Sequence, residues 1–175
     1  MIFLDESGVN LAMTRLYGWA PRAERAGGHA PKNWKGNVTL CAGVCQEGLL
    51  APLLLFGPMT GDAFEAYLEQ FLLPELRPGD VVLCDNLSAH KRGGFAALLA
   101  NAGAELVYLP PYSPDLNPIE KMWSQVKSWL RHGAARTLED LENNVVSALR
   151  TVTPTNARNY FRSCGYIVSP LCKLL

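Results

Sequence analysis

The sequence lacks the features of a membrane-bound or disulfide-bonded protein. No apolar run approaches the roughly 18 residues that a bilayer-spanning helix needs, and no basic segment followed by an apolar stretch opens the chain. We therefore expect neither a signal peptide nor membrane association. The five cysteines are odd in number and none forms a C-x-x-C pair, which favours buried free thiols over disulfides or a zinc site. These absences predict a soluble, cytoplasmic protein.

The sequence also lacks net charge, because 16 Lys and Arg residues balance 16 Asp and Glu residues. This balance argues against nucleic-acid binding through overall charge. The charges are nevertheless distributed unevenly: residues 121–136 include four Lys or Arg and no acid, and the chain after Asn143 carries basic charges only. The pattern indicates either a basic end suited to an anionic partner or ordinary surface variation.

The composition, 49% hydrophobic and 18% charged, is that of a folded domain with an apolar core. A chain of 175 residues fits one domain, which we place at 1–165, with 166–175 as a C-terminal tail. Hydrophobic periodicity then predicts the individual elements. We expect strands at 1–4, 37–45, 49–56, 80–84 and 105–109, a hairpin with a long loop at 12–35, and helices at 62–73, 91–102, 118–132, 137–151 and 154–163.

The order of these elements predicts an α/β fold. Strands 37–45 and 49–56 flank a short polar turn and should pair antiparallel. The strand–helix–strand segment at 81–109 indicates parallel pairing, and its two nearly all-apolar strands should be buried on both faces. The result is a mixed sheet with helices on its faces.

Two aspartates directly follow predicted strands: Asp5 follows 1–4 and Asp85 follows 80–84. If these strands are parallel neighbours, both carboxylates lie at the sheet edge where ligand sites occur. Carboxylates held close together repel unless a cation lies between them, and oxygen ligands without a His or Cys cluster favour magnesium or manganese. The alternative is that each aspartate forms a turn, a role that both local sequences suit.

Glu120 lies at the start of the predicted helix 118–132 and has two explanations. Asn117 is a good N-cap, Pro118 suits the first helical position, and Glu120 lies three residues after the cap. A capping box would thus explain Glu120 without catalysis. The alternative is a third carboxylate that joins Asp5 and Asp85 in a metal site.

The helix that follows Glu120 has an apolar stripe and a polar flank. Glu120, Ser124, Lys127 and Arg131 share the flank, which suits phosphate contacts along a helix or a solvated face. We predict that Lys127 and Arg131 contact DNA. The stripe comprises Ile119, Met122, Trp123, Val126, Trp129 and Leu130.

Three segments together resemble the DDE transposases of bacterial insertion sequences in the mariner superfamily. They are FLDES at 3–7, LCDNLSAHK at 83–91 and LPPYSPDLNPIEKMW at 109–123, and YGWAPRAER at 17–25 is similar to the second-strand region of that family. Between Asp85 and Glu120 lie 34 residues, the spacing associated with this group. The likeness covers most of residues 1–165.

The resemblance implies a ribonuclease H-like fold in which Asp5, Asp85 and Glu120 form a catalytic triad that binds two Mg²⁺ or Mn²⁺ ions. Asn86 and His90 match family positions near this site. The implied activity is metal-dependent DNA cleavage followed by transfer of the 3′-hydroxyl end to a target. The implied partners are transposon ends, target DNA and further copies of the chain in a synaptic complex.

In one respect the chain departs from this family. Family members carry a helix-turn-helix region ahead of the first aspartate, whereas this sequence begins four residues before Asp5. The resemblance therefore implies either a truncated remnant or a second reading frame fused by frameshift to an upstream helix-turn-helix product. Two other functions stay open: a metal-dependent nuclease that does not join strands, and a non-catalytic DNA-binding or regulatory fragment.

Overall fold

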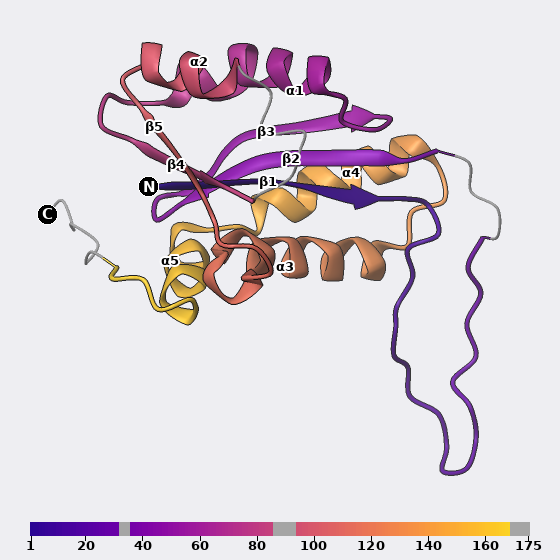
Figure 1. Cartoon of the computed structure of the whole chain (residues 1–175). Coiled ribbons are helices and arrows are strands. Elements are labelled where there is room, and N and C mark those ends of the chain that lie inside the picture. The colour runs from indigo at the N-terminus through magenta and orange to yellow at the C-terminus, as the bar shows by residue number, and fades with distance from the viewer. Residues whose placement is uncertain (32–35, 86–93, 169–175) are drawn as a thin grey trace, which may run out of the picture.

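Apolar segments that lie far apart in the chain pair to form one five-stranded sheet (Figure 1). The computed structural model describes residues 1–31, 36–85 and 94–168. Across the sheet the strands follow the order β3-β2-β1-β4-β5. They are β1 (Ile2–Val9), β2 (Val38–Cys45), β3 (Gly48–Phe56), β4 (Val81–Cys84) and β5 (Glu105–Tyr108).

The sheet is mixed, as the sequence predicts. β1 and β3 each pair antiparallel with β2, whereas β4 pairs parallel with both β1 and β5. The β2–β3 hairpin turns at Gln46 and Glu47, after which Gly48 starts β3 with a φ of 136° that other residues rarely adopt. The parallel pair β4–β5 needs a crossover, which the segment containing α2 supplies.

Helices cover both faces of the sheet (Figure 1). Threonine side chains cap three of them: Thr60, Thr137 and Thr153 each accept a hydrogen bond from the backbone N–H three residues later. The helices α1 and α2 lie on one face, and α3, α4 and α5 lie on the other. Their bounds are α1 (Gly61–Tyr67), α2 (Phe95–Asn101), α3 (Pro118–Gly133), α4 (Leu138–Arg150) and α5 (Pro154–Ser163).

Alternation along β1 divides the core into two parts. Phe3 packs in the cluster under α3, α4 and α5, whereas Leu4 packs in the cluster under α1 and α2. Because successive side chains of a strand point to opposite faces, Asp5 projects on the same side as Phe3, toward α3. The fold thus directs an acidic side chain into the space between the sheet and α3.

Most predicted elements are confirmed, but four details of the sequence reading are wrong. β1 continues through Asp5 to Val9, because β2 pairs along that polar stretch. β5 was expected to be buried on both faces, yet it lies at the sheet edge with Tyr108 36% exposed. Helix 62–73 is α-helical only to Tyr67 and continues as a π-helical turn at Leu68–Leu72 and a 3-10 turn. Fourth, two side chains that were expected in buried apolar stripes are partly exposed: Phe71 is 39% exposed and Trp129 is 47% exposed.

The segment between β1 and β2 extends away from the sheet as a long arm (Figure 1). We define the arm as residues 12–31, and in this described part it contains neither helix nor strand, so the expected hairpin strands are not formed there. Arg136 holds the base of the arm: its Nη1 donates hydrogen bonds to the carbonyls of Leu11 and Met13, at 3.0 and 3.1 Å. The start of the arm is therefore attached to the segment that links α3 and α4.

Two further points concern the ends of the fold and its hydropathy. In the parts of the chain described here, no helix combines the length and apolar character that crossing a membrane requires. The domain boundary at residue 165 stays a prediction. Tyr166 packs edge-on against Phe3 and Phe161, and its hydroxyl donates a 2.7 Å hydrogen bond to the carbonyl of Leu116.

Candidate active site

The register of β1 and β4 brings two aspartates together. Leu4 is paired with Cys84 in this parallel ladder, so Asp5 and Asp85 are the next residues along the two neighbouring strands. Phe3 and Leu83, two residues earlier, both belong to the core cluster under α3. Strand alternation therefore places both aspartates on the α3 side of the sheet. Asp5 is buried, with 8% of its surface exposed, and Asp85 is partly buried.

Glu120 approaches this position from the first turn of α3. Pro118 begins the helix, and the backbone N–H of Glu120 donates a 3.2 Å hydrogen bond to the carbonyl of Asn117. The Asn117 side chain makes no capping hydrogen bond, and within the described residues its buried Oδ1 has no partner. The predicted capping box is therefore wrong, since the backbone carbonyl takes the N–H that the side chain would need. The exposed Glu120 carboxylate is not explained as a helix cap.

The three acids influence one another electrostatically at Asp5. The pKa of Asp5 is raised from 3.8 to about 7, chiefly by burial and also by the negative charges of Glu120, Asp85 and Glu6. A hydrogen bond from the backbone N–H of Glu6 opposes these effects. Asp5 is thus a buried carboxyl, and its ionisation is disfavoured in part by the charges of Asp85 and Glu120. These are the two acids that the sequence predicts in the same metal site as Asp5.

The donor chemistry suits a hard divalent cation. Asp5, Asp85 and Glu120 offer carboxylate oxygens only, the ligands that Mg²⁺ and Mn²⁺ prefer. A cation would also relieve the repulsion that disfavours the ionised form of Asp5. In the ranges 1–31, 36–85 and 94–168, no three His, Cys, Asp or Glu side chains stand close enough together to hold a metal ion. Asn86 and His90 lie outside the described residues, so their place beside the site stays a prediction.

We expect Asp5 to make the metal-free protein less stable as the pH rises. Because its pKa is raised to about 7 in the folded state, the folded protein binds this proton more tightly than the unfolded chain does. The stabilisation is complete below about pH 4 and is lost as the pH rises to about 7. Asp5→Asn should therefore increase the free energy of unfolding at pH 8 by roughly 2–4 kcal/mol.

Urea unfolding in EDTA at pH 5 and pH 8 measures this effect. The difference between Asp5→Asn and wild type should be larger at pH 8 than at pH 5, since only the wild type loses the proton between these values. Other titrating groups are shared by both proteins and cancel in the difference. If the difference in the free energy of unfolding between Asp5→Asn and wild type were the same at pH 5 and pH 8, Asp5 would ionise as freely in the folded protein as in the unfolded chain.

The two residues predicted to contact DNA occupy different environments on α3. Both are partly buried, but Arg131 lines a pocket between α3 and the arm, together with Ser124, whereas Lys127 does not line it. The residues of the polar flank inferred from the sequence therefore do not all face this pocket. No signal in the sequence indicates this pocket, because Arg15 and His132 meet there across 117 residues of chain.

The mixed sheet with flanking helices has the ribonuclease H-like architecture, and Asp85 directly follows β4 beside Asp5 of the neighbouring strand β1. Residues 1–142 match the family model described as "DDE superfamily endonuclease". The chain therefore belongs to the DDE superfamily endonuclease family. This confirms the DDE part of the resemblance. No curated protein matches the chain in sequence.

Solved structures of Mos1 transposase have a similar fold. The strand transfer complex of Mos1 aligns with a TM-score of 0.71 at 17% identity, covering 94% of this chain and 50% of that chain. The paired-end complex with the left transposon end gives a TM-score of 0.69 at 17% identity, with 94% and 51% covered. The Mos1 catalytic domain alone gives 0.62 at 15% identity, with 94% and 74% covered. The chain spans about half the length of the first two Mos1 chains, and the likeness confirms the ribonuclease H-like fold.

Proposed function

We propose that this chain is the catalytic domain of a DDE transposase, and that Asp5, Asp85 and Glu120 are its catalytic acids. The observation that carries the proposal is the buried Asp5 carboxyl, whose pKa is raised to about 7 with contributions from the charges of Glu120 and Asp85. Membership of the DDE superfamily endonucleases supports the same conclusion. The register of β1 and β4, in which Asp5 and Asp85 are the next residues along neighbouring strands, also supports the proposal.

The three carboxylates would hold two Mg²⁺ or Mn²⁺ ions. When bound, such ions supply Lewis-acid stabilisation to the attacking and leaving oxygens of an in-line phosphoryl transfer. Similar folds support this reading, since the solved Mos1 paired-end complexes include one described with Mn and one with Mg. Because no three His, Cys, Asp or Glu side chains in the described residues stand close enough together to hold a metal ion, the proposal requires the three acidic side chains to move closer together on binding.

Each acid is positioned by a different part of the fold. Asp5 is fixed within β1, where the Glu6 N–H hydrogen-bonds its carboxylate. Asp85 follows β4, the central parallel strand next to β1. Glu120 is carried by α3, which is anchored in the core through Ile119 and Trp123. These supports hold two acids on the sheet and bring the third from the helix that covers it.

The partners of this domain would be transposon-end and target DNA. This proposal is supported by the similar Mos1 structures, one of which is described as a paired-end complex with the left transposon end and another as a strand transfer complex. We propose further that copies of the chain associate in a synaptic complex and that Lys127 and Arg131 contact DNA phosphates. A bacterial insertion-sequence origin, a cytoplasmic location and an upstream helix-turn-helix product fused by frameshift belong to the same proposal.

A strand-transfer assay distinguishes transposase from nuclease. The substrate is a duplex that carries the terminal sequence of the element followed by flanking DNA, with a 5′ label on the strand whose cleavage leaves the element's 3′-hydroxyl, incubated with supercoiled plasmid and Mg²⁺ or Mn²⁺. We expect cleavage to release the flanking DNA and shorten the labelled strand, and the labelled strand then to be joined to the plasmid, because a transposase uses the new 3′-hydroxyl as the second nucleophile. Cleavage without joining would identify a nuclease of the same fold. The absence of any metal-dependent product would identify a non-catalytic fragment.

A further inference from the structure

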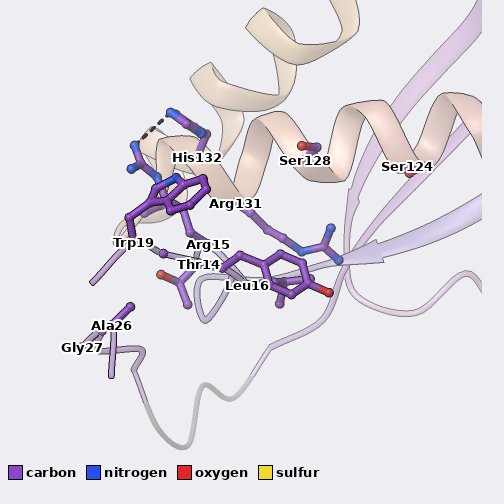
Figure 2. Close-up of a pocket in the computed structure, with 14 residues that line it drawn as sticks. Thr14, Arg15, Leu16, Trp19, Ala26, Gly27, Ser124, Ser128, Arg131 and His132 are labelled. Carbon is purple, nitrogen blue, oxygen red and sulfur yellow. Dashed lines mark hydrogen bonds between the residues drawn. The ribbon is translucent and has the colours of Figure 1, made fainter. Parts of the chain in front are cut away.

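A second site lies between the arm and the part of α3 that begins at Ser124. It is an open pocket of about 1000 Å³, and the arm forms one side of it while α3 forms the other (Figure 2). Its volume is at the upper end of the roughly 300–1,000 Å³ typical of ligand pockets. The DDE family assignment and the three catalytic acids do not account for this pocket.

Basic side chains line the pocket from both sides. Arg15 comes from the arm, and Arg131 and His132 come from the last turn of α3. Arg15 Nη2 donates a 2.9 Å hydrogen bond to Nε2 of His132, which links the two sides (Figure 2). Among the described residues, no Asp or Glu lines the pocket, and neither Arg15 nor Arg131 forms an ion pair. The pocket therefore presents cationic groups that an anionic ligand would neutralise.

Hydroxyl groups add hydrogen-bonding capacity next to these cations. Thr14 of the arm and Ser124 and Ser128 of α3 line the same pocket. Ser124 and Ser128 are exposed and lie one turn apart on the helix. Arginine guanidinium groups and the hydroxyl groups of Ser and Thr are among the side-chain groups that bind phosphate oxygens in protein–DNA complexes.

Two aromatic rings on the arm distinguish this pocket from a simple phosphate site. Tyr17 is 90% exposed and Trp19 is 103% exposed, although both line the pocket wall. The two sides of the arm approach each other closely here, since a Cβ on Gly18 would stand 3.0 Å from the Ala26 Cβ. Exposed aromatic rings beside cationic groups are the arrangement on which unpaired bases stack in single-strand-binding proteins.

The pocket lies at a defined separation from the acids. Glu120 and Arg131 are eleven residues apart on one helix, which corresponds to about 16 Å along α3. A stacked nucleic-acid strand rises about 3.4 Å per nucleotide, so roughly five nucleotides span that separation. A strand cut at the acids could therefore continue along α3 to the arm.

We propose that this arm pocket binds one or two unpaired nucleotides of single-stranded DNA, with phosphates against Arg15 and Arg131 and a base against Trp19. The choice of DNA rests on the proposed function of the acidic site. Unpaired nucleotides fit better than duplex DNA, because the bases of a duplex are stacked on one another and cannot place a face on Trp19.

Fluorescence anisotropy with the full chain tests the proposal. The probes are labelled dT12 and a labelled 12-base-pair duplex, both in EDTA so that the acids and their metal play no part. Trp19→Ala should weaken dT12 binding by roughly 5- to 100-fold, the range measured for loss of one base stack, and should weaken duplex binding far less. Trp129→Ala is the matched control, because Trp129 is an exposed tryptophan of α3 that does not line this pocket. It should change dT12 binding by less than about twofold.

Salt titration of dT12 binding tests the two arginines separately. Arg131→Ala should lower the slope of log K against log salt by about 0.7, the value for one phosphate contact on a single strand. The double variant Arg15→Ala/Arg131→Ala should lower it by about 1.4. Arg150→Ala, an exposed arginine on α4, is the control and should leave the slope unchanged.

Three results would overturn the proposal: no binding of dT12 by the wild type, unchanged dT12 binding in Trp19→Ala, or equal loss of dT12 and duplex binding in that variant. The last result would mean a contact with the duplex backbone. Asp85→Asn should bind dT12 like the wild type. Loss of cleavage in that variant therefore tests the acidic site alone, and loss of dT12 binding in Trp19→Ala tests the pocket alone.

Discussion

Asp85→Asn and Glu120→Gln should each reduce metal-dependent DNA cleavage by at least about a thousandfold while the protein stays folded. Each change keeps the size of the side chain and removes the charge that a divalent ion requires. Metal ions supply several kcal/mol of transition-state stabilisation, and about 4 kcal/mol corresponds to three orders of magnitude in rate. Nicking of supercoiled plasmid in Mn²⁺ measures the loss, and circular dichroism with thermal melting measures the fold.

Glu139→Gln is the matched control for Glu120→Gln. Glu139 is also an exposed glutamate in the first turn of a helix, in this case α4, and it lies outside the proposed site. Its loss should leave nicking unchanged. Full nicking activity in Glu120→Gln would remove Glu120 from the catalytic acids. A loss of folding in Asp85→Asn would indicate that Asp85 serves as a structural turn residue.

Trp123→Ala should destabilise the protein by about 3–5 kcal/mol, the range for removing a large aromatic side chain from a core. Trp123 is 2% exposed in the cluster that joins α3 to the sheet, so its removal leaves a cavity beneath the helix that carries Glu120. The lower half of the range is expected, because in the described part of the chain the buried indole N–H has no hydrogen-bond partner and its loss costs nothing.

The second tryptophan of α3 provides the comparison for this effect. Trp129 is 47% exposed, so Trp129→Ala should cost about 1 kcal/mol or less. Urea unfolding of both variants decides the matter, with the free energy of unfolding as the measured quantity. Equal destabilisation by Trp123→Ala and Trp129→Ala would contradict the burial described for α3. It would mean that Trp129 is buried like the other members of the predicted apolar stripe.

The two tryptophans show how far periodicity predicts burial. A 3.6-residue pattern correctly identified α3 and its buried face, including Ile119 and Trp123. The same pattern also included Trp129, because the width of an apolar stripe does not reveal how much of it a neighbouring helix covers. β5 was misjudged for the same reason, since an apolar strand does not reveal whether it lies at the edge of the sheet.

The three acids were predicted from different signals, and their assembly into a metal site stays a prediction. The order of elements was enough to expect Asp5 beside Asp85, whereas Glu120 joined them through its long motif and the family resemblance. Asp5 was expected at a strand end, because Asp-Glu-Ser-Gly is a good turn sequence. Pairing with β2 instead satisfies the backbone of this polar stretch and buries both Asp5 and Ser7. The arm pocket could not be predicted, because its two sides come from distant segments of the sequence, with Arg15 and His132 117 residues apart.

A crystal structure with Mn²⁺ tests the catalytic assignment most directly, since anomalous scattering locates the ions independently of activity. We predict two Mn²⁺ ions about 3.5–4 Å apart, with oxygens of Asp5, Asp85 and Glu120 as protein ligands. The side chains should draw closer together than in the metal-free protein, and Asp85→Asn should lose at least one ion. Ordered Asp5, Asp85 and Glu120 carboxylates without Mn²⁺ between them, in crystals saturated with the metal, would contradict the assignment.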